Sequence, residues 1–592
     1  MTTRLRAGGL VPLLMALVLS GSAPPEAPVA DAAMSGDADR VVALLRSGAD
    51  VNAAQGDGMT ALHWAAYNGQ VGLVETLLQA GARTEAVTRI GSYTPLHHAA
   101  RNGFADVVQA LVSAGADVEA VTSTGQARAL HLAAASGREA AVRALIEGGA
   151  DVDARETSWG QTPLMFAAGS GRTDVVRMLL GHGADPALTT SVVDITAMEA
   201  VDRTAGEVRT EVLERFRAED DGDGSWRPDP AQVRAAVRAA REVQEAQTIS
   251  SDAPERPVDE DAFVGYTGLV GTQGGLTALL HAVREGHAET ALALLDNGAD
   301  IDQRSAGDGT PPLLMATING HFDLAMQLLD RGADPNLASR AGATPLYTAL
   351  NTQWAPKARY PQQQAYQQQR ASYLDIMKAL LEAGADPDVR LDQHLWYMSY
   401  TFDLLGINAA GSTAFWRAAY ATDVEAMRLL IAYGADPDIP TIRPPDRRGG
   451  GEGQGEADPS GLPPVRVGGP AVWPIHAAAG VGYGQGYAGN AHRHVPDGWM
   501  PTMRYLVEEL GVDVNARDHD GYNAVHHAAA RGDDEMIAFL VDHGADVMAV
   551  SRRGQTTVDM ANGPVQRIQP FPSTIALLES LGAKNNHNCV SC

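Results

Sequence analysis

The sequence contains no set of residues typical of an enzyme active site. It has no G-x-S-x-G nucleophile motif, no H-E-x-x-H zinc motif and no phosphate-binding P-loop. One G-x-G-x-x-G string occurs at Gly484, Gly486 and Gly489, but no strand is predicted before it. A dinucleotide site needs this string between a strand and a helix, so we interpret it as a flexible turn. We therefore predict a protein that is not an enzyme and that needs no cofactor.

Two segments contain residue types that could bind a metal ion. His492 and His494 are close in sequence, but no cysteine or second histidine pair lies near them to complete a ligand set. Segment 219–224, Glu-Asp-Asp-Gly-Asp-Gly, is similar to the start of an EF-hand calcium loop. Its twelfth position is Pro230, where a bidentate carboxylate is needed. We predict a solvated acidic linker there, with calcium binding as the alternative, and we predict no metal site.

The two cysteines of the chain, Cys589 and Cys592, form a C-x-x-C pair near its C-terminus. The pair resembles the first part of the haem-attachment motif of c-type cytochromes, which continues with a histidine. No histidine follows here, and His587 precedes the pair. Three interpretations stay open: a truncated haem fusion, an exposed dithiol or disulfide without a catalytic role, and a metal or redox site.

The N-terminus has the features of a secretory signal peptide. Arg4 and Arg6 form a basic region, residues 10–19 are largely apolar, and small residues follow. The apolar stretch is too short to span a membrane. We predict cleavage near Ala23, with a cut after Ala32 as the alternative, and hence a location in the periplasm or outside the cell.

The composition restricts the classes of partner. The chain has 592 residues and a formal net charge of −27, from 45 Lys and Arg against 72 Asp and Glu. Since a single core rarely exceeds about 250–300 residues, we expect several domains or an elongated repeat. The acidic balance disfavours binding to nucleic acid and to anionic lipid. No apolar run reaches the roughly 20 residues of a membrane-spanning helix.

A regular repeat organises most of the sequence. Its most frequent signal is Gly followed by Ala and usually Asp, which starts at Gly48 and recurs at nearly constant spacing up to Gly183. The Gly signal returns, with small variations after it, at seven later positions: Gly298, Gly332, Gly384, Gly434, Gly511, Gly544 and Gly582. Many units also begin with a Thr-Pro-Leu-His-like sequence, as at residues 94–97, and have a central glycine, such as Gly103.

These signals predict two short helices in each unit. Thr94 is a suitable N-cap, and Pro95 fits the first helical position, where a missing N–H costs nothing. Gly103 ends the first helix, and the apolar stripe at 107–112 predicts the second. Gly115 then supplies the left-handed conformation that terminates it. One such pair cannot bury its own apolar face, so we expect the units to stack.

The order and spacing of these signals resemble those of ankyrin-repeat proteins. The resemblance covers most of residues 29–583 and implies an all-α solenoid of about 12 helix-pair units, with finger loops and several insertions. It also implies a concave binding surface, a role in protein–protein recognition and no catalytic site. Five histidines occupy the fourth motif position, where we expect each imidazole to bond to neighbouring loop backbone: His63, His97, His131, His476 and His526.

Interruptions of the repeat predict the domain organisation. We expect a signal peptide at 1–23, repeats at 29–217, an insertion at 218–274, further repeats at 275–583 and a tail at 584–592. In this scheme Thr196–Ala200 continues a degenerate repeat. Four more insertions are predicted at 351–371, 387–410, 437–471 and 480–499. Three insertions then lie at the finger edge, and two lie between the paired helices of a unit.

The finger edge is where we predict partner recognition. Segment 387–410 is unusually aromatic, with Trp396, Tyr397, Tyr400 and Phe402 close together. These side chains could anchor a partner, or they could fold inward and fix the long finger to its neighbours. We expect the finger-edge insertions, not the regular repeats at 58–183, to determine partner specificity. The predicted function is an exported, non-enzymatic scaffold that binds a protein or peptide, and the alternative is an electron-transfer accessory that presents a truncated c-type haem segment.

Overall fold

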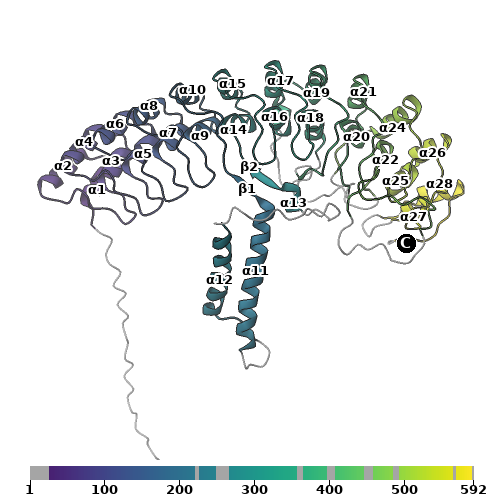
Figure 1. The fold of residues 1–592 in the computed structure, drawn as a ribbon, viewed down its shortest axis with the longest axis horizontal. Coiled ribbons are helices and arrows are strands. Elements are labelled where there is room, and N and C mark those ends of the chain that lie inside the picture. Colours follow the sequence, from purple (N-terminus) through teal and green to yellow (C-terminus); the bar gives the residue numbers. More distant parts are fainter. Residues whose placement is uncertain are drawn as a thin grey trace, which may run out of the picture. The chain divides into compact units, whose positions relative to one another are not determined.

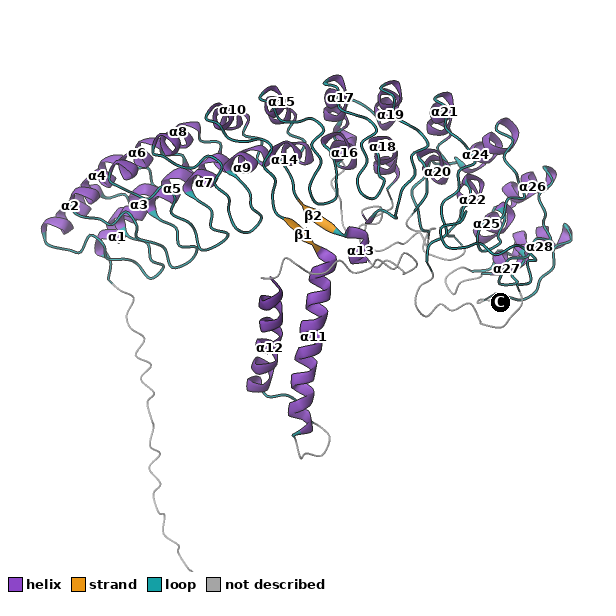
Figure 2. Ribbon diagram, viewed as in Figure 1, coloured by secondary structure: helices purple, strands orange, loops and turns teal. Residues whose placement is uncertain are grey.

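Short antiparallel helix pairs make up nearly all of the structure (Figures 1 and 2). The computed structural model describes residues 26–219, 226–248, 266–355, 365–396, 407–445, 458–483, 492–563 and 569–589. They belong to two units, Met1–Ser158 and Trp159–Cys592. The predicted signal peptide lies outside the described residues, and so does most of the acidic segment 219–224. None of the described helices combines the length and the hydrophobicity that crossing a membrane requires.

The first unit contains four helix pairs. They are α1 (Pro28–Met34) with α2 (Ala38–Arg46), α3 (Ala61–Tyr67) with α4 (Val71–Gln79), α5 (Pro95–Asn102) with α6 (Ala105–Ser113), and α7 (Ala129–Ser136) with α8 (Glu139–Glu147). In Figure 1 the first helices of these pairs form one row and the second helices form another. We call the first helix of each pair its inner helix, and we call the loop that precedes each inner helix a finger.

The second unit contains eight further pairs. They are α9 (Pro163–Gly169) with α10 (Thr173–Gly181), α14 (Ala278–Arg284) with α15 (Ala288–Asp296), α16 (Pro312–Ile318) with α17 (Phe322–Asp330), α18 (Pro345–Trp354) with α19 (Tyr373–Glu382), α20 (Ala414–Tyr420) with α21 (Val424–Ala432), α22 (Pro474–Ala479) with α24 (Trp499–Arg504), α25 (Ala524–Arg531) with α26 (Asp534–Asp542), and α27 (Thr557–Asn562) with α28 (Pro572–Ser580). The predicted all-α solenoid of about 12 pairs is therefore confirmed.

The motif residues form the ends of the helices, as the sequence predicts. The Thr94 hydroxyl accepts a hydrogen bond from the His97 backbone N–H, and the Thr94 N–H donates to His97 Nδ1 at 3.1 Å. This reciprocal capping satisfies two N–H groups that would otherwise lack partners. Gly103 ends the helix with φ of 83°, in the left-handed region that favours glycine. Leu96 and Leu111 are buried between the paired helices, so each pair contributes a narrow apolar core.

Polar residues at the base of the fingers join successive repeats. Asp50 Oδ1 accepts from the Asn52 N–H at 2.9 Å, which closes a local turn. Asn52 then donates to the Gly81 carbonyl at 3.2 Å and accepts from the Arg83 N–H at 2.8 Å, both in the next repeat. Asn515 makes the equivalent two bonds in the second unit, at 2.9 and 2.7 Å. The Gly-Ala-Asp signal therefore marks inter-repeat hydrogen bonds, each contributing about 1 kcal/mol.

The predicted start of the first insertion is wrong. In place of a degenerate repeat that reaches Arg217, the structure has one 24-residue helix, α11 (Ile195–Ala218). It packs against α12 (Pro230–Thr248), and the two form a helical hairpin that projects from the second unit (Figure 1). Strand β1 (Val192–Asp194) pairs antiparallel with β2 (Thr272–Gly274) at the base of the hairpin. The short helix α13 (Tyr266–Val270) also packs against α11.

The array continues directly across this hairpin, because α9 packs against α14 and α10 packs against α15. The insertion therefore spans about residues 192–274. Thr196 has the spacing of the motif, but a second helix would require a break near Gly206, and Gly206 continues the helix. The i,i+4 ion pairs Arg203–Glu199 and Arg215–Glu211 favour one long exposed helix.

Two other long connections separate paired helices. Residues 355–372 connect α18 to α19 and include the 3₁₀ helix η1 (Ala365–Gln368). Residues 480–498 connect α22 to α24, which continues into a π-helical turn at Tyr505–Glu509. These connections lie at the turn edge of the array, opposite the fingers.

Candidate functional site

One position of each inner helix faces away from the stacked repeats. In the first unit it is filled by Trp64, His98 and Leu132, which follow one another at the period of the repeat and are half-buried. Tyr67, one turn beyond Trp64 on α3, is 47 % exposed. The inner helices of the first unit therefore present a row of large side chains to solvent, and we call this row the inner face.

The aromatic side chains of the inner face support one another. The Tyr67 ring lies edge-on to His98, with 5.8 Å between centroids, and Trp64 lies 5.9 Å from Tyr67. Tyr93, from the finger before α5, lies 5.6 Å from His98. Trp64 Nε1 donates to Gln55 Oε1 at 2.8 Å. These contacts fix the rings in place, so little side-chain entropy is lost when a partner covers them.

The fingers add aliphatic side chains to this surface. Ile90, in the same finger as Tyr93, is 84 % exposed, and Val87 in that finger is also exposed. Val121 is exposed on the next finger. A single exposed apolar residue is unremarkable, but a group on neighbouring fingers beside an aromatic floor has the composition of an interface core.

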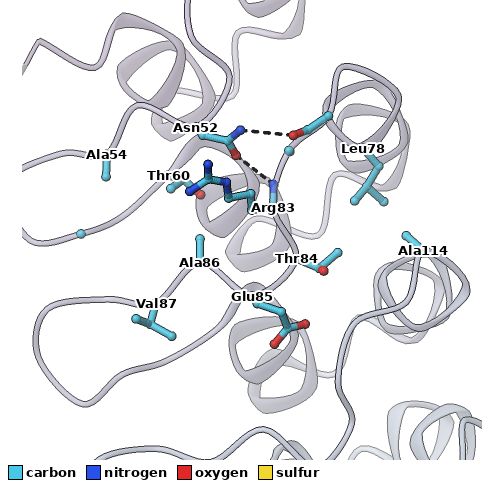
Figure 3. A pocket seen from close by; sticks show the side chains of 13 residues that line it. Asn52, Ala54, Thr60, Leu78, Arg83, Thr84, Glu85, Ala86, Val87 and Ala114 are labelled. Carbon is cyan, nitrogen blue, oxygen red and sulfur yellow. Dashed lines mark hydrogen bonds between the residues drawn. The ribbon is translucent and has the colours of Figure 1, made fainter.

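A hollow of about 670 Å³ lies at the base of the fingers that flank α3 and α5 (Figure 3). Asn52, Leu78 and Val87 are among its lining residues. Arg83 occupies the position that Asp fills in most units, and Figure 3 shows its side chain crossing the hollow toward Thr60. Arg83 forms no ion pair with any residue that the structure describes. The hollow thus presents the guanidinium of Arg83 together with the carboxylate of Glu85.

The same position of the inner helices is covered in the second unit from α18 onward. Thr348, Arg417, His527 and Met560 occupy it and are at most 3 % exposed. Inserted segments, one between repeats and one between the paired helices α22 and α24, provide part of the cover. Leu391 and Leu395 pack with Tyr347 and Ala409 in one buried cluster, and His492 stacks on Tyr420 with 4.3 Å between ring centroids. The inner face is therefore open in the first unit and filled by the chain itself in this part of the second.

The structure describes only part of each predicted site. Trp396 is half-buried at the end of a segment whose Leu395 lies in the buried cluster. Tyr397, Tyr400 and Phe402 lie outside the described residues. Cys589 is disulfide-bonded. Cys592, the other cysteine of the chain, lies outside the described residues.

Two of the five motif histidines, His63 and His476, make the predicted hydrogen bond to neighbouring loop backbone. His63 Nε2 lies 3.0 Å from the Tyr93 carbonyl oxygen, and His476 Nε2 lies 2.9 Å from that of Ala516. Burial lowers the pKa of both imidazoles to about 4, so both are neutral near pH 7. His492 and His494 have ring centroids 5.1 Å apart, but no group of three possible metal ligands occurs among the described side chains.

The sequence prediction missed the inner face of the first unit. Trp64, His98 and Leu132 are aligned by the period of the repeat, directly after the fourth motif position. The large side chains that recur at this position of the repeat are the sequence signal of this surface. The exposed Tyr67 and Ile90 have no such periodic signal.

Comparison with known sequences agrees with this architecture. The family model for ankyrin repeats matches residues 29–122, 120–190 and 279–390, and a second ankyrin-repeat model matches residues 506–561. The chain belongs to the ankyrin-repeat family. Ankyrin repeats support a role as a protein–protein interaction scaffold, and they imply protein partners.

The individual relatives share short segments of this ankyrin-repeat chain. Protein phosphatase 1 regulatory subunit 12A of Rattus norvegicus is 33 % identical over 95 residues, which cover 16 % of this chain and 8 % of that protein. Ankyrin repeat domain-containing protein 49 of Bos taurus is 40 % identical over 52 residues, which cover 9 % of this chain and 22 % of the relative. Palmitoyltransferase akr1 of Schizosaccharomyces pombe is 40 % identical over 53 residues, which cover 9 % and 8 %. The chain thus spans less than a quarter of each relative, and their names describe different proteins built with the same repeat.

Proposed function

We propose that this ankyrin-repeat protein is a non-enzymatic scaffold that binds a protein or peptide on the inner face of its first unit. The observation that supports the proposal is the contrast between the first unit and the part of the second unit from α18 onward. Trp64, Tyr67 and His98 are open beside apolar fingers, whereas Arg417 and His527, in the same register of the second unit, are covered. A partner can reach the first set of side chains without displacing other parts of the chain.

The chemistry of the inner face favours a partner segment with apolar and cationic side chains. Trp64, Tyr67 and Tyr93 offer ring faces, on which aliphatic groups pack and cations bind. The chain carries a net charge of −27, and this charge attracts a basic partner during diffusion. Arg83 in the nearby hollow would pair with an acidic residue of the same partner. The protein would then select partner segments that carry one acidic residue, which pairs with Arg83, among apolar or basic residues.

A capture experiment tests this assignment. The purified protein and its Trp64→Ala/Tyr67→Ala variant are used as baits in an extract of the source cells, and the captured proteins are identified by mass spectrometry. Tyr433→Ala is the matched control, because Tyr433 is an exposed aromatic residue at the end of α21 in the second unit. We expect the partner to be lost only with the double variant, at unchanged helical circular dichroism. Equal capture by all three proteins would refute the assignment.

The aromatic segment at 387–410 is a second candidate surface, predicted from the sequence. Trp396→Ala is the variant that tests it, because Trp396 is half-buried and is the one member of the aromatic group that the structure describes. If this variant loses the partner and the Trp64→Ala/Tyr67→Ala variant keeps it, specificity belongs to the finger-edge insertion.

We also propose that the scaffold is exported from the cytoplasm. The support is the order of basic, apolar and small residues over positions 1–23. Fractionation of cells that produce the full chain should give a processed protein outside the cytoplasm, with a new N-terminus near Ala23. A protein that keeps Met1 and stays with cytoplasmic markers would overturn this proposal.

A further inference from the structure

Two insertions of the second unit differ in composition from the rest of the chain. Segments 351–371 and 480–496, the second of which ends just before Asp497, contain no Asp or Glu, although these residues make up 72 of the 592 positions. The structure brings the two insertions together at the turn edge. Arg493 Nη1 and Nη2 both donate to the Tyr366 hydroxyl at 3.3 Å. The carboxylates of Asp323 and Asp423 contact segment 351–371, but they lie on or next to the helices α17 and α21 and are already hydrogen-bonded. The two segments themselves therefore add no negative charge that would repel an anion, in a chain of net charge −27.

Arg417, on α20 beneath these insertions, is a buried cation without a direct carboxylate partner. Its side chain is 1 % exposed. Nε donates to Asn351 Oδ1 at 2.9 Å, and Nη2 donates to the Trp354 carbonyl at 2.5 Å. Nη1 is also buried and has no hydrogen-bond partner. A guanidinium that is buried with neutral partners is costly unless a negative charge lies close to it.

The carboxylate of Asp423, which acts on Arg417 through space, already accepts hydrogen bonds from other donors. Asp423 Oδ2 accepts from Trp354 Nε1 at 2.8 Å and from the Tyr373 hydroxyl at 2.7 Å, and its Oδ1 accepts from the Ala426 N–H at 3.0 Å. Asp423 lowers the electrostatic cost of Arg417 through space, but it leaves Nη1 without an acceptor.

His492 supplies a second donor beside Arg417. Its ring stacks on Tyr420, and the Arg417 guanidinium lies 5.9 Å from the centroid of the same Tyr420 ring. Nδ1 of His492 lies 3.4 Å from the Tyr483 hydroxyl, which can donate to it. The proton of the neutral imidazole is then on Nε2, which is buried beside the Tyr420 backbone and makes no hydrogen bond of normal geometry. Two buried donors without a well-formed hydrogen bond thus lie around one aromatic ring.

We propose that Arg417, His492 and Arg493 form a binding site for an oxyanion group, a carboxylate or a phosphate. Arg417 Nη1 and His492 Nε2 donate to the anion, and the half-buried Arg493 guides it in from solvent. Charge-assisted hydrogen bonds from a guanidinium suit both groups. The site lies on the turn edge of the second unit and does not depend on the proposed partner-binding face.

Titration calorimetry on the full chain tests the site, with inorganic phosphate and acetate as separate probes and sodium chloride at matched ionic strength as the reference. We expect saturable binding of at least one probe with a stoichiometry of one, and the probe that binds identifies the group. Arg417→Gln should weaken binding by roughly tenfold or more, since a charged donor is lost. Arg428→Gln is the control, because Arg428 is an exposed arginine on α21 that pairs with Glu509.

Arg493→Gln is a second test variant, which is needed if Arg417→Gln does not fold. Arg493 is half-buried, and its partner in the described residues is one neutral hydroxyl, so its replacement should leave the fold intact. We expect weaker anion binding at unchanged circular dichroism. The absence of saturable binding of both probes by the unmodified protein would overturn the proposal, as would equal affinities in Arg493→Gln and Arg428→Gln.

Discussion

Mild acid should destabilise the repeats through their buried neutral histidines. Burial lowers the pKa of His63, His98 and His281 to about 4, compared with 6.5 in an unfolded chain. Below pH 6.5 the unfolded chain therefore binds protons that the folded chain cannot bind. The stability contributed by these groups is fully present above pH 6.5 and is lost as the pH falls from 6.5 toward 4.

The size of the effect follows from the two pKa values. One unit of pKa difference corresponds to about 1.4 kcal/mol, so a histidine shifted from 6.5 to about 4 costs the fold roughly 2 kcal/mol at pH 5 and about 3 kcal/mol below pH 4. The contributions of His63 and His98 are not additive, because their ring centroids lie 5.9 Å apart and each charge disfavours the other.

His63→Gln isolates one of these groups. The variant loses the hydrogen bonds of His63 to Thr60 and Tyr93, so it is less stable than the unmodified protein at pH 7. It no longer has a titrating group at this position. The difference in local unfolding free energy between the unmodified protein and the variant should therefore shrink by about 2 kcal/mol between pH 7 and pH 5. His182→Gln, at an exposed histidine after α10, is the control and should change little at either pH.

Hydrogen exchange measured by mass spectrometry is the appropriate assay, because a long repeat array does not unfold in one step. Peptides that cover α3 and α5 report the local opening free energy at each pH after correction for intrinsic exchange rates. If the difference in opening free energy between the unmodified protein and His63→Gln stays constant from pH 7 to pH 5, the reasoning is refuted, since His63 would then titrate normally in the folded protein.

Three further predictions concern the array, the hairpin and the C-terminus. Leu130→Ala should cost about 2–5 kcal/mol in the local stability of α7 and α8, because Leu130 is buried in the core; exchange of the α7 peptides measures this cost. Replacement of residues 195–271 by a short glycine linker should keep the repeats folded, because α9 already packs against α14; loss of helical signal beyond that of α11 and α12 would contradict the direct stacking. Expression of the chain with a haem-attachment machinery should give colourless protein, because His587 precedes the C-x-x-C pair and Cys589 is disulfide-bonded, and Cys592→Ser should leave the fold unchanged; a Soret band that this substitution removes would favour the electron-transfer alternative.

The sequence by itself determined the repeat unit. Thr94, Pro95, Gly103 and Gly115 act within a few residues of their own position, as N-cap, first helical residue and helix terminators. Such local effects hold in any surroundings, so each helix pair could be predicted from its own residues, and the regular recurrence of the pairs then required them to stack. Local patterns failed at Thr196, where the motif spacing is present but nothing ends the helix before Ala218.

Only the tertiary structure decided which surfaces remain open. Trp64 and Arg417 occupy the same register of an inner helix, yet Trp64 is half-exposed and Arg417 is buried, because residues far away in the sequence, such as Asn351 and Trp354, cover Arg417. The contact of Arg493 with Tyr366 joins residues 127 positions apart, and no period in the sequence predicts it. Which side chains are exposed, and which distant residues touch, depends on where the inserted segments pack against the repeats. That packing involves several segments at once, so the residues of a single repeat do not predict it.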